Sequence, residues 1–171
     1  SRYRVKHADP YGIEIETKER DVDYLLNLYQ EILEELKDIL NSYHQIKGSS
    51  RYWKIILGPW LQIFLSIMFY HWEAIHKVIK DYDIERVNIS NVNPEKLISH
   101  SFTDFQKIYR DEAWDQSVYA DIIKNFTELD YEYLTKKESR INNHSKQNKY
   151  DYFFARKKQI LQKIRKKIVI F

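Results

Sequence analysis

The sequence predicts a mainly α-helical fold: a helical hairpin, further helices and a few short strands. Three observations predict it. Apolar residues recur every three or four positions over long stretches, which is the period of a helix with one buried face. Only 3 Gly and 3 Pro occur among 171 residues, so few positions interrupt a helix. The apolar share of 43% is enough to fill the core of one domain.

The first long helix is predicted from Asp21 to Ile46. Asp21 is a suitable N-cap, and Gly48 can adopt the left-handed conformation that follows a helix. The apolar positions form one seam with steps of three and four, widened by three leucines, which favours packing in a multi-helix core. The seam consists of Val22, Leu25, Tyr29, Ile32, Leu36, Ile39, Tyr43 and Ile46, and the leucines are Leu26, Leu33 and Leu40.

A second helix is predicted to begin near Arg51, capped by Ser49 or Ser50. The short turn before it makes the two helices antiparallel. Pro59 removes one backbone donor and clashes with the preceding turn, so we expect the helix to kink or restart at Gly58-Pro59.

The stretch from Trp53 to Trp72 is apolar nearly all round. Such a segment is either the buried centre of a domain or a membrane span. Its uninterrupted apolar part is shorter than the roughly 20 residues that a span needs, and the first helix offers a matching seam. Burial is therefore the favoured interpretation.

The second half of the chain is predicted to mix helices and strands. Residues 84–89 (IERVNI) alternate apolar and polar side chains, as a strand does, and further short strands are expected near 3–6 and 168–171. One helix should run from Pro94 to about Arg110, and Asp111 should cap another. Residues 130–149 are polar and are predicted to be mostly loop.

The positive charge is concentrated at the end of the chain. Residues 136–171 carry a net charge of +10, whereas residues 1–135 carry −7. We therefore expect a helical domain over 1–135 and a basic linker with an amphipathic helix, Tyr150 to Lys167, over 136–171. This helix either makes weak contact with an anionic membrane or lies solvated against the acidic part of the protein. No specific nucleic-acid partner is expected.

Composition excludes several kinds of site. The absence of cysteine rules out disulfides, thiolate zinc sites and cysteine nucleophiles, and it fits a cytoplasmic protein. Gly12, Gly48 and Gly58 lie too far apart for a glycine-rich phosphate loop, so no cofactor is expected in this chain. No metal is expected either: His71 and His76 are five residues apart and point about 140° away from each other on a helix.

Two Asp-x-Asp strings, at residues 21–23 and 81–83, have the pattern that holds a divalent ion in some sugar transferases. Carboxylates suit such ions. Chance explains both strings in a chain rich in aspartate, and Asp81 precedes the predicted strand, where a catalytic pair would follow one.

The most specific string is RYWKIILGPWL, from Arg51 to Leu61. It resembles the signature of a family of transferases from bacterial O-antigen and surface-polysaccharide gene clusters. The resemblance covers roughly residues 20–126 and includes Asp111 to Trp114, similar to a later D-E-W block. The chain departs from the family pattern at residues 70–72, where an aspartate and an arginine are usual.

The resemblance implies a larger α/β protein with two glycosyltransferase-like domains, of which this chain is an excised part without both flanking parts. It further implies a nucleotide-sugar donor, a glycan or lipid-linked acceptor, and a cytoplasmic location peripheral to the inner face of the membrane. We expect the fragment alone to have no turnover.

Four residues are candidates for such a site. Arg51 can make bidentate contacts with phosphate or carboxylate, and Trp53 and Trp60 can form apolar walls against a sugar or lipid. His71 is a candidate general base because imidazole titrates near neutral pH. Each of them is equally well explained as a structural residue. The alternative function is a non-enzymatic interaction module, with the helical hairpin as its partner surface and the basic helix as its membrane or polyanion contact.

Overall fold

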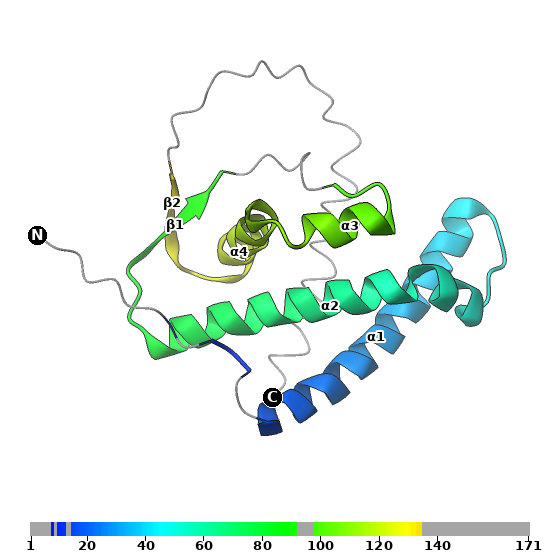
Figure 1. The fold of residues 1–171 in the computed structure, drawn as a ribbon, viewed down its shortest axis with the longest axis horizontal. Coiled ribbons are helices and arrows are strands. Elements are labelled where there is room, and N and C mark those ends of the chain that lie inside the picture. The colour runs from blue at the N-terminus through cyan, green and yellow to red at the C-terminus, as the bar shows by residue number, and fades with distance from the viewer. Residues whose placement is uncertain (1–7, 9, 13–14, 92–97, 135–171) are drawn as a thin grey trace, which may run out of the picture. The chain divides into compact units, whose positions relative to one another are not determined.

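The computed structural model describes residues 8, 10–12, 15–91 and 98–134, and over these ranges the fold is mainly helical, as predicted (Figure 1). The chain divides into two compact units at Tyr82. The predicted boundary between residues 135 and 136 adjoins residues outside the described ranges and stays a prediction. In chain order the elements are α1 (Ile15–His44), α2 (Ser50–Asp81), β1 (Arg86–Ser90), α3 (Phe102–Ile108), α4 (Glu112–Phe126) and β2 (Asp130–Leu134).

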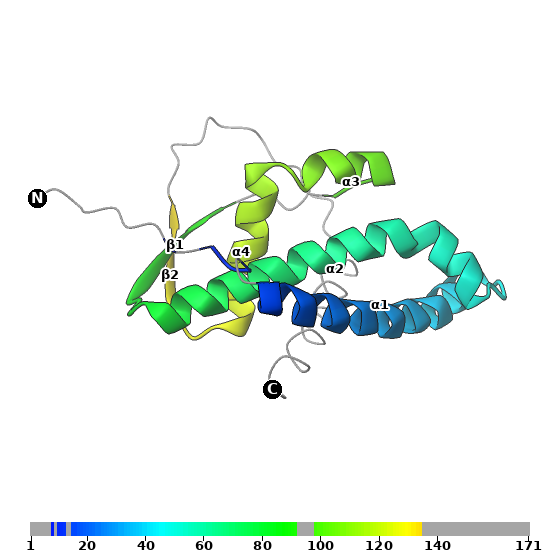
Figure 2. The same ribbon diagram turned by 60° about the horizontal axis from the view of Figure 1, so that its bottom comes forward.

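The first unit is the predicted helical hairpin. Helices α1 and α2 lie side by side and run antiparallel (Figures 1 and 2). Their facing sides bury aliphatic and aromatic side chains, and removal of each such side chain from water stabilises the fold by about 1.5–3 kcal/mol. The most buried are Leu28, Ile32 and Leu33 of α1 and Leu61, Leu65, Met68 and Trp72 of α2.

Both predicted ends of the first helix are wrong. The helix begins at Ile15, so Asp21 lies inside it and is not a cap; its carboxylate instead accepts a hydrogen bond from Tyr11 Oη at 2.6 Å. At the other end the left-handed conformation belongs to Gln45, with φ 53°, and not to Gly48. The predicted seam is buried only in its middle, because Val22 and Tyr43 near its ends are exposed.

The second helix starts as predicted. The Ser49 side chain caps α2 by accepting a hydrogen bond from the Tyr52 N–H. The helix continues through Pro59 to Asp81 as one element, so the predicted restart does not occur. Among the described residues, α2 alone is long and apolar enough to cross a membrane, a test that core helices of soluble proteins also pass. In its apolar stretch of 18 residues, 44% is buried.

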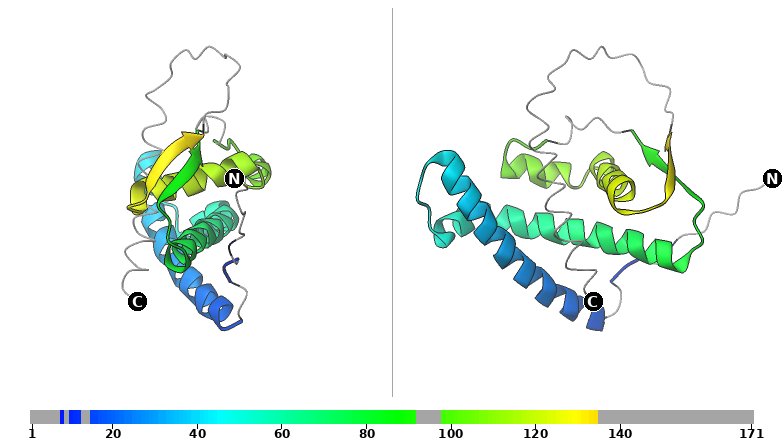
Figure 3. Two further views of the ribbon diagram at one scale, coloured as in Figure 1. Left: turned by 90° about the vertical axis from the view of Figure 1, so that its left-hand side faces the viewer. Right: turned by 180° about the vertical axis from the view of Figure 1, so that it is seen from behind.

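The second unit contains a parallel pair of strands. β1 and β2 lie side by side (Figure 3), with a register that pairs Arg86 with Asp130 and Ser90 with Leu134. Helices α3 and α4 form the connection, and α4 packs on β1. The small core of this unit includes Ile89, Phe105, Trp114, Val118, Ile122 and Ile123.

Strand β1 confirms the prediction over 84–89, whereas β2 corrects the predicted loop from residue 130. All five residues of β2 are exposed, so the strand lacks the apolar run that buried parallel strands show. Tyr131 and Tyr133 alternate with acidic residues along it.

Helix α3 begins later than predicted. Residues 98–101 are not helical, and Ser101 precedes the helix and accepts a hydrogen bond from the Asp104 N–H. Pro94, predicted in the first turn, lies outside the described residues. Asp111 caps α4, as predicted, by accepting from the Ala113 N–H at 2.7 Å. The predicted strands near 3–6 and 168–171 and the basic helix Tyr150 to Lys167 lie outside the described residues.

Candidate functional site

The start of the Arg51–Leu61 string is fixed to α1 by one amide side chain. Trp53 is buried, and its indole Nε1–H donates to Asn41 Oδ1 at 2.9 Å. The same oxygen accepts from the Gly48 N–H at 2.8 Å, and Asn41 Nδ2 donates to the Gly48 carbonyl at 2.9 Å. Asn41 therefore joins α1, the turn and α2. We call this region, residues 41–56, the closed end of the hairpin.

Two glycines allow close contacts around the same string. A Cβ on Gly48 would lie 2.7 Å from Trp53 Nε1 and equally close to the Tyr52 ring. A Cβ on Gly58 would lie 2.7 Å from Tyr29 Oη. Both distances are shorter than a carbon contact tolerates, so packing accounts for these two glycines.

Arg51 and Trp60 keep surface that a ligand can reach, and Trp53 keeps little. Arg51 is exposed in the first turn of α2. Trp60 is half-buried and stacks on Phe64 with 5.1 Å between the ring centroids. Only 5% of Trp53 is exposed, so its measurable role is to hold the hairpin together.

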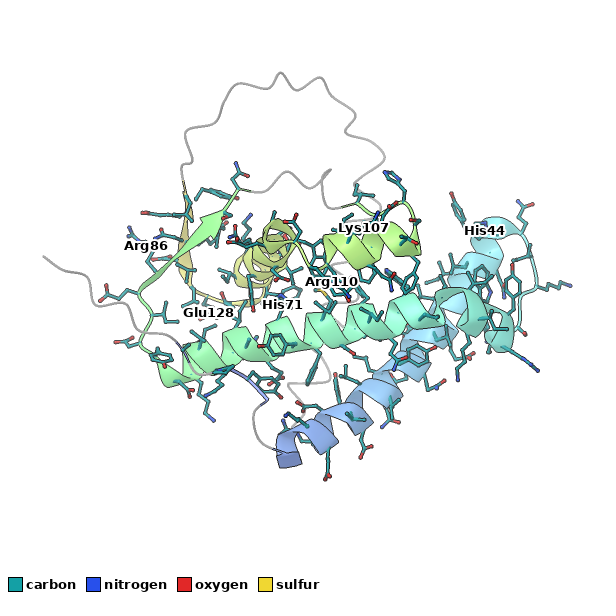
Figure 4. All side chains as sticks on the ribbon, viewed as in Figure 1. His44, His71, Arg86, Lys107, Arg110 and Glu128 are labelled. Carbon is teal, nitrogen blue, oxygen red and sulfur yellow. The ribbon has the colours of Figure 1, made fainter. Side chains whose placement is uncertain are left out.

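His71 is buried on α2 (Figure 4), and a backbone carbonyl fixes its tautomer. Its Nδ1 lies 2.8 Å from the Ile67 carbonyl oxygen. A carbonyl only accepts, so Nδ1 carries the hydrogen and Nε2 is the nitrogen that would take up a further proton. His76 makes the equivalent contact with the Trp72 carbonyl, also at 2.8 Å.

The four candidate residues do not form one site on this helix. Arg51 and His71 are 20 residues apart on one continuous helix, which separates their backbones by about 30 Å. Trp60 and His71 are 11 residues apart, which is about three turns and brings both to the same face of α2. The candidates therefore form two groups: Arg51 with Trp53 at the closed end, and Trp60 with His71 further along.

The other end of the hairpin carries a cluster of ionisable groups that sequence reasoning missed. It comprises Tyr11, Arg20, Asp21, Tyr24 and Glu73, and we call it the open end. Tyr11 Oη donates to Asp21 at 2.6 Å, and Arg20 Nη2 lies 3.0 Å from the same carboxylate and 3.4 Å from Tyr11 Oη. One carboxylate thus holds a phenol and a guanidinium.

Four groups at the open end have raised pKa values: Tyr11, Arg20, Tyr24 and Glu73. Burial raises the pKa of Glu73 above its ordinary value, the negative charge of Asp21 raises it further, and Arg20 opposes the shift. Burial, and then the charge of Glu73, raise the pKa of Tyr24, whose buried hydroxyl has no hydrogen-bond partner among the described residues. Burial also raises the pKa of Tyr11, as does its hydrogen bond to Asp21. Glu73 is thereby suited to acid–base work.

One sequence signal could have identified Glu73. Residues 39–72 contain no Asp or Glu, so Glu73 is the first carboxylate after a long acid-free stretch and directly follows the nearly apolar segment 53–72. No such signal marks Tyr11, which reaches Asp21 from outside the helix. Within the described ranges, no group of three or more His, Asp or Glu side chains is placed to hold a metal ion.

Comparisons with known proteins give one result. The family described as LIC12162 family transferase matches residues 3–171, nearly the whole chain. Neither the curated proteins nor the solved structures include a match. With its matched range spanning both units of the fold, the chain belongs to the LIC12162 family of transferases.

Proposed function

We propose that the chain is the helical portion of a sugar-nucleotide-dependent transferase in bacterial surface-polysaccharide (O-antigen) biosynthesis. The observation that carries the proposal is the transferase-family match over residues 3–171. The resemblance of RYWKIILGPWL to the signature of O-antigen-cluster transferases supports the finer assignment. The donor is a nucleotide sugar and the acceptor is a glycan or a lipid-linked glycan, at the cytoplasmic, inner face of the membrane.

The chemistry of this proposal uses the face shared by Trp60 and His71. In this proposal the acceptor reaches His71, which is as little exposed as Trp53, at 5%. His71 Nε2 takes the proton of the acceptor hydroxyl while the Ile67 carbonyl holds the ring through Nδ1. The hydroxyl oxygen bonds to the anomeric carbon of the donor sugar, and the bond from that carbon to the phosphate oxygen breaks, so the nucleotide leaves. The half-buried Trp60 ring offers an apolar surface to the sugar.

Arg51 serves a different part of the ligand in this proposal. At about 30 Å from His71 along α2, it cannot touch the reacting atoms, so it contacts a phosphate or carboxylate away from them. Trp53 positions Arg51 by fixing the first turn of α2 to Asn41. The basic segment Tyr150 to Lys167 adds weak, salt-sensitive contact with the anionic membrane.

The test is transfer by the complete gene product. Nucleotide sugars of several classes are supplied together with lipid-linked glycan acceptors, and nucleotide release and sugar incorporation are both measured. We expect one donor to support both. Transfer from another kind of activated donor, with none from nucleotide sugars, would contradict the proposal.

His71→Gln tests the role of the base separately. Loss of a general base typically lowers turnover by about 10²–10⁴-fold, with the melting temperature as the control for folding. His76→Gln is the matched variant, because His76 makes the same contact with a carbonyl four residues earlier, and it should retain turnover. Unchanged turnover in His71→Gln would remove His71 as the base and leave the donor assignment standing.

A further inference from the structure

The closed end of the hairpin exposes large apolar side chains. Ile55 is 70% exposed and Tyr43 is 72% exposed, and exposed apolar side chains that cluster in this way mark interaction sites. The full set is Tyr43, Ile46, Tyr52, Ile55 and Ile56, and we call it the apolar tip. It comes from the last turn of α1, the connecting turn and the first two turns of α2.

Positive charge surrounds the apolar tip. Lys47, Arg51 and Lys54 are exposed, and residues 39–72 contain no Asp or Glu. The nearest acidic residues along α1 are Asp38, Glu35 and Glu34. Asp38 and Glu34 form ion pairs with Lys37, and Glu34 also reaches Ser50. The closed end therefore combines apolar surface with cations that no acid within it neutralises.

The cations lie beside the apolar side chains around α2, over an arc of about 200°. At about 100° per residue, the order around the helix is Lys54, Arg51, Ile55, Tyr52 and Ile56. Trp53 occupies the opposite, buried side. Apolar side chains flanked by lysine and arginine on one face are typical of segments that lie in the interface of a lipid bilayer.

The closed end is already ordered before any partner binds. The Asn41 amide forms hydrogen bonds with Gly48 in the turn and with Trp53. The tip therefore loses little conformational entropy when it docks. A second exposed apolar pair, Val22 and Leu26 of α1, lacks this charge pattern because Asp21 and Asp23 flank it.

We propose that the apolar tip docks on an anionic lipid surface. Tyr52, Ile55 and Ile56 enter the boundary between headgroups and acyl chains, and the cations contact anionic headgroups. The occupant follows from charge complementarity: an apolar surface bordered by Lys47, Arg51 and Lys54 matches a negatively charged, partly apolar layer. The inference is independent of the group that the transferase moves and of the basic segment at residues 150–167.

The test is co-sedimentation of the 171-residue chain with vesicles. One set contains phosphatidylcholine with about one-third phosphatidylglycerol, and the other contains phosphatidylcholine alone, at low salt and at about 0.5 M salt, where charge interactions are screened within a few ångströms. We expect binding to the anionic vesicles at low salt and release at high salt. Equal binding to neutral vesicles, or binding that high salt does not release, would overturn the proposal.

Paired variants locate the surface. Ile55→Ser with Ile56→Ser, and separately Lys47→Gln with Lys54→Gln, should each weaken binding by about tenfold or more. Lys47→Arg with Lys54→Arg keeps the charge and should bind as the wild type does. All the altered residues are exposed, and circular dichroism verifies that each variant folds.

The matched control is Val22→Ser with Leu26→Ser. It removes apolar surface of similar exposure in an acidic setting, and it should leave binding within about twofold of the wild type. An equal loss in this control would overturn the proposal. So would wild-type binding by the tip variants, because binding would then belong to another surface such as residues 150–167.

Discussion

The two ends of the α1–α2 hairpin are stabilised by different chemistry. At the closed end a neutral amide, Asn41, joins the two helices through hydrogen bonds to Gly48 and Trp53. At the open end the corresponding contacts are between ionisable groups, with Asp21 holding Tyr11 and Arg20. The hydrogen bonds of Asn41 should therefore be indifferent to pH, whereas the contacts at the open end should respond to it.

The largest expected effect is that of Trp53→Ala. The substitution removes a buried indole and leaves a cavity, which costs about 3–5 kcal/mol of unfolding free energy for an aromatic residue in a core. Denaturant unfolding measures this loss. Val22→Ala, an exposed position near the open end, should change stability by no more than about 0.5 kcal/mol. Similar small losses in both variants would mean that Trp53 does not fix the hairpin.

The second-largest loss of stability is expected for Asn41→Ala. It removes the partner of two N–H groups and one carbonyl, and each buried group left unsatisfied costs about 1–3 kcal/mol, less where water can enter. Asn41→Asp keeps an acceptor for the Gly48 and Trp53 N–H groups and should lose less. Thermal unfolding of the two variants shows which of them loses more stability. A larger loss in Asn41→Asp than in Asn41→Ala would contradict this account, because both variants lack the amide donor and only Asp keeps the acceptor.

Gly58→Ala tests the contact with Tyr29. The new Cβ would lie 2.7 Å from Tyr29 Oη, and overpacking of this kind costs about 1–3 kcal/mol. Tyr29→Phe removes that hydroxyl. In the Tyr29→Phe background we expect Gly58→Ala to become neutral or stabilising, because Ala is favoured over Gly in a helix by about 1 kcal/mol.

A double-mutant cycle of unfolding free energies checks this interpretation. Additive effects of Gly58→Ala and Tyr29→Phe would refute a steric role for Gly58.

The sequence predicted the hairpin well because the hairpin depends on local signals. The periodic seam around Ile32 and the Ser49 cap both act within a few residues of themselves, and the structure confirms both. Gly48 was assigned the wrong role because two requirements compete for it. The absence of a side chain on Gly48 lets Trp53 and Tyr52 pack closely against it. The left-handed conformation occurs at Gln45 instead.

The rest could not be predicted because it depends on contacts between distant segments. Strand β2 forms by pairing with β1. Its own residues are all exposed, so they give no apolar pattern that predicts a strand. The open end depends on Tyr11 meeting Asp21 across ten positions. Spacing placed His71 and Trp60 on one helix, but the distance from Arg51 follows only from the continuity of α2 through Pro59.

The smallest expected effect is the pH dependence that Glu73 contributes. Its folded-state pKa is raised above the ordinary value of 4.5, so its protonated form favours the folded state. Stability from this group is fully present below about pH 4.5 and is lost as pH rises through the raised pKa. Glu73→Gln cannot lose a proton, so its stability relative to the wild type should increase over that range.

The most direct test of the difference between the two ends is the unfolding free energy measured from pH 4 to 8 for the wild type, Asn41→Ala and Glu73→Gln. Asn41→Ala should lower the whole curve without changing its slope, because it removes no ionisable group. Glu73→Gln should flatten the decline above about pH 4.5. A wild-type slope in Glu73→Gln, or a changed slope in Asn41→Ala, would contradict the assignment of pH sensitivity to the open end.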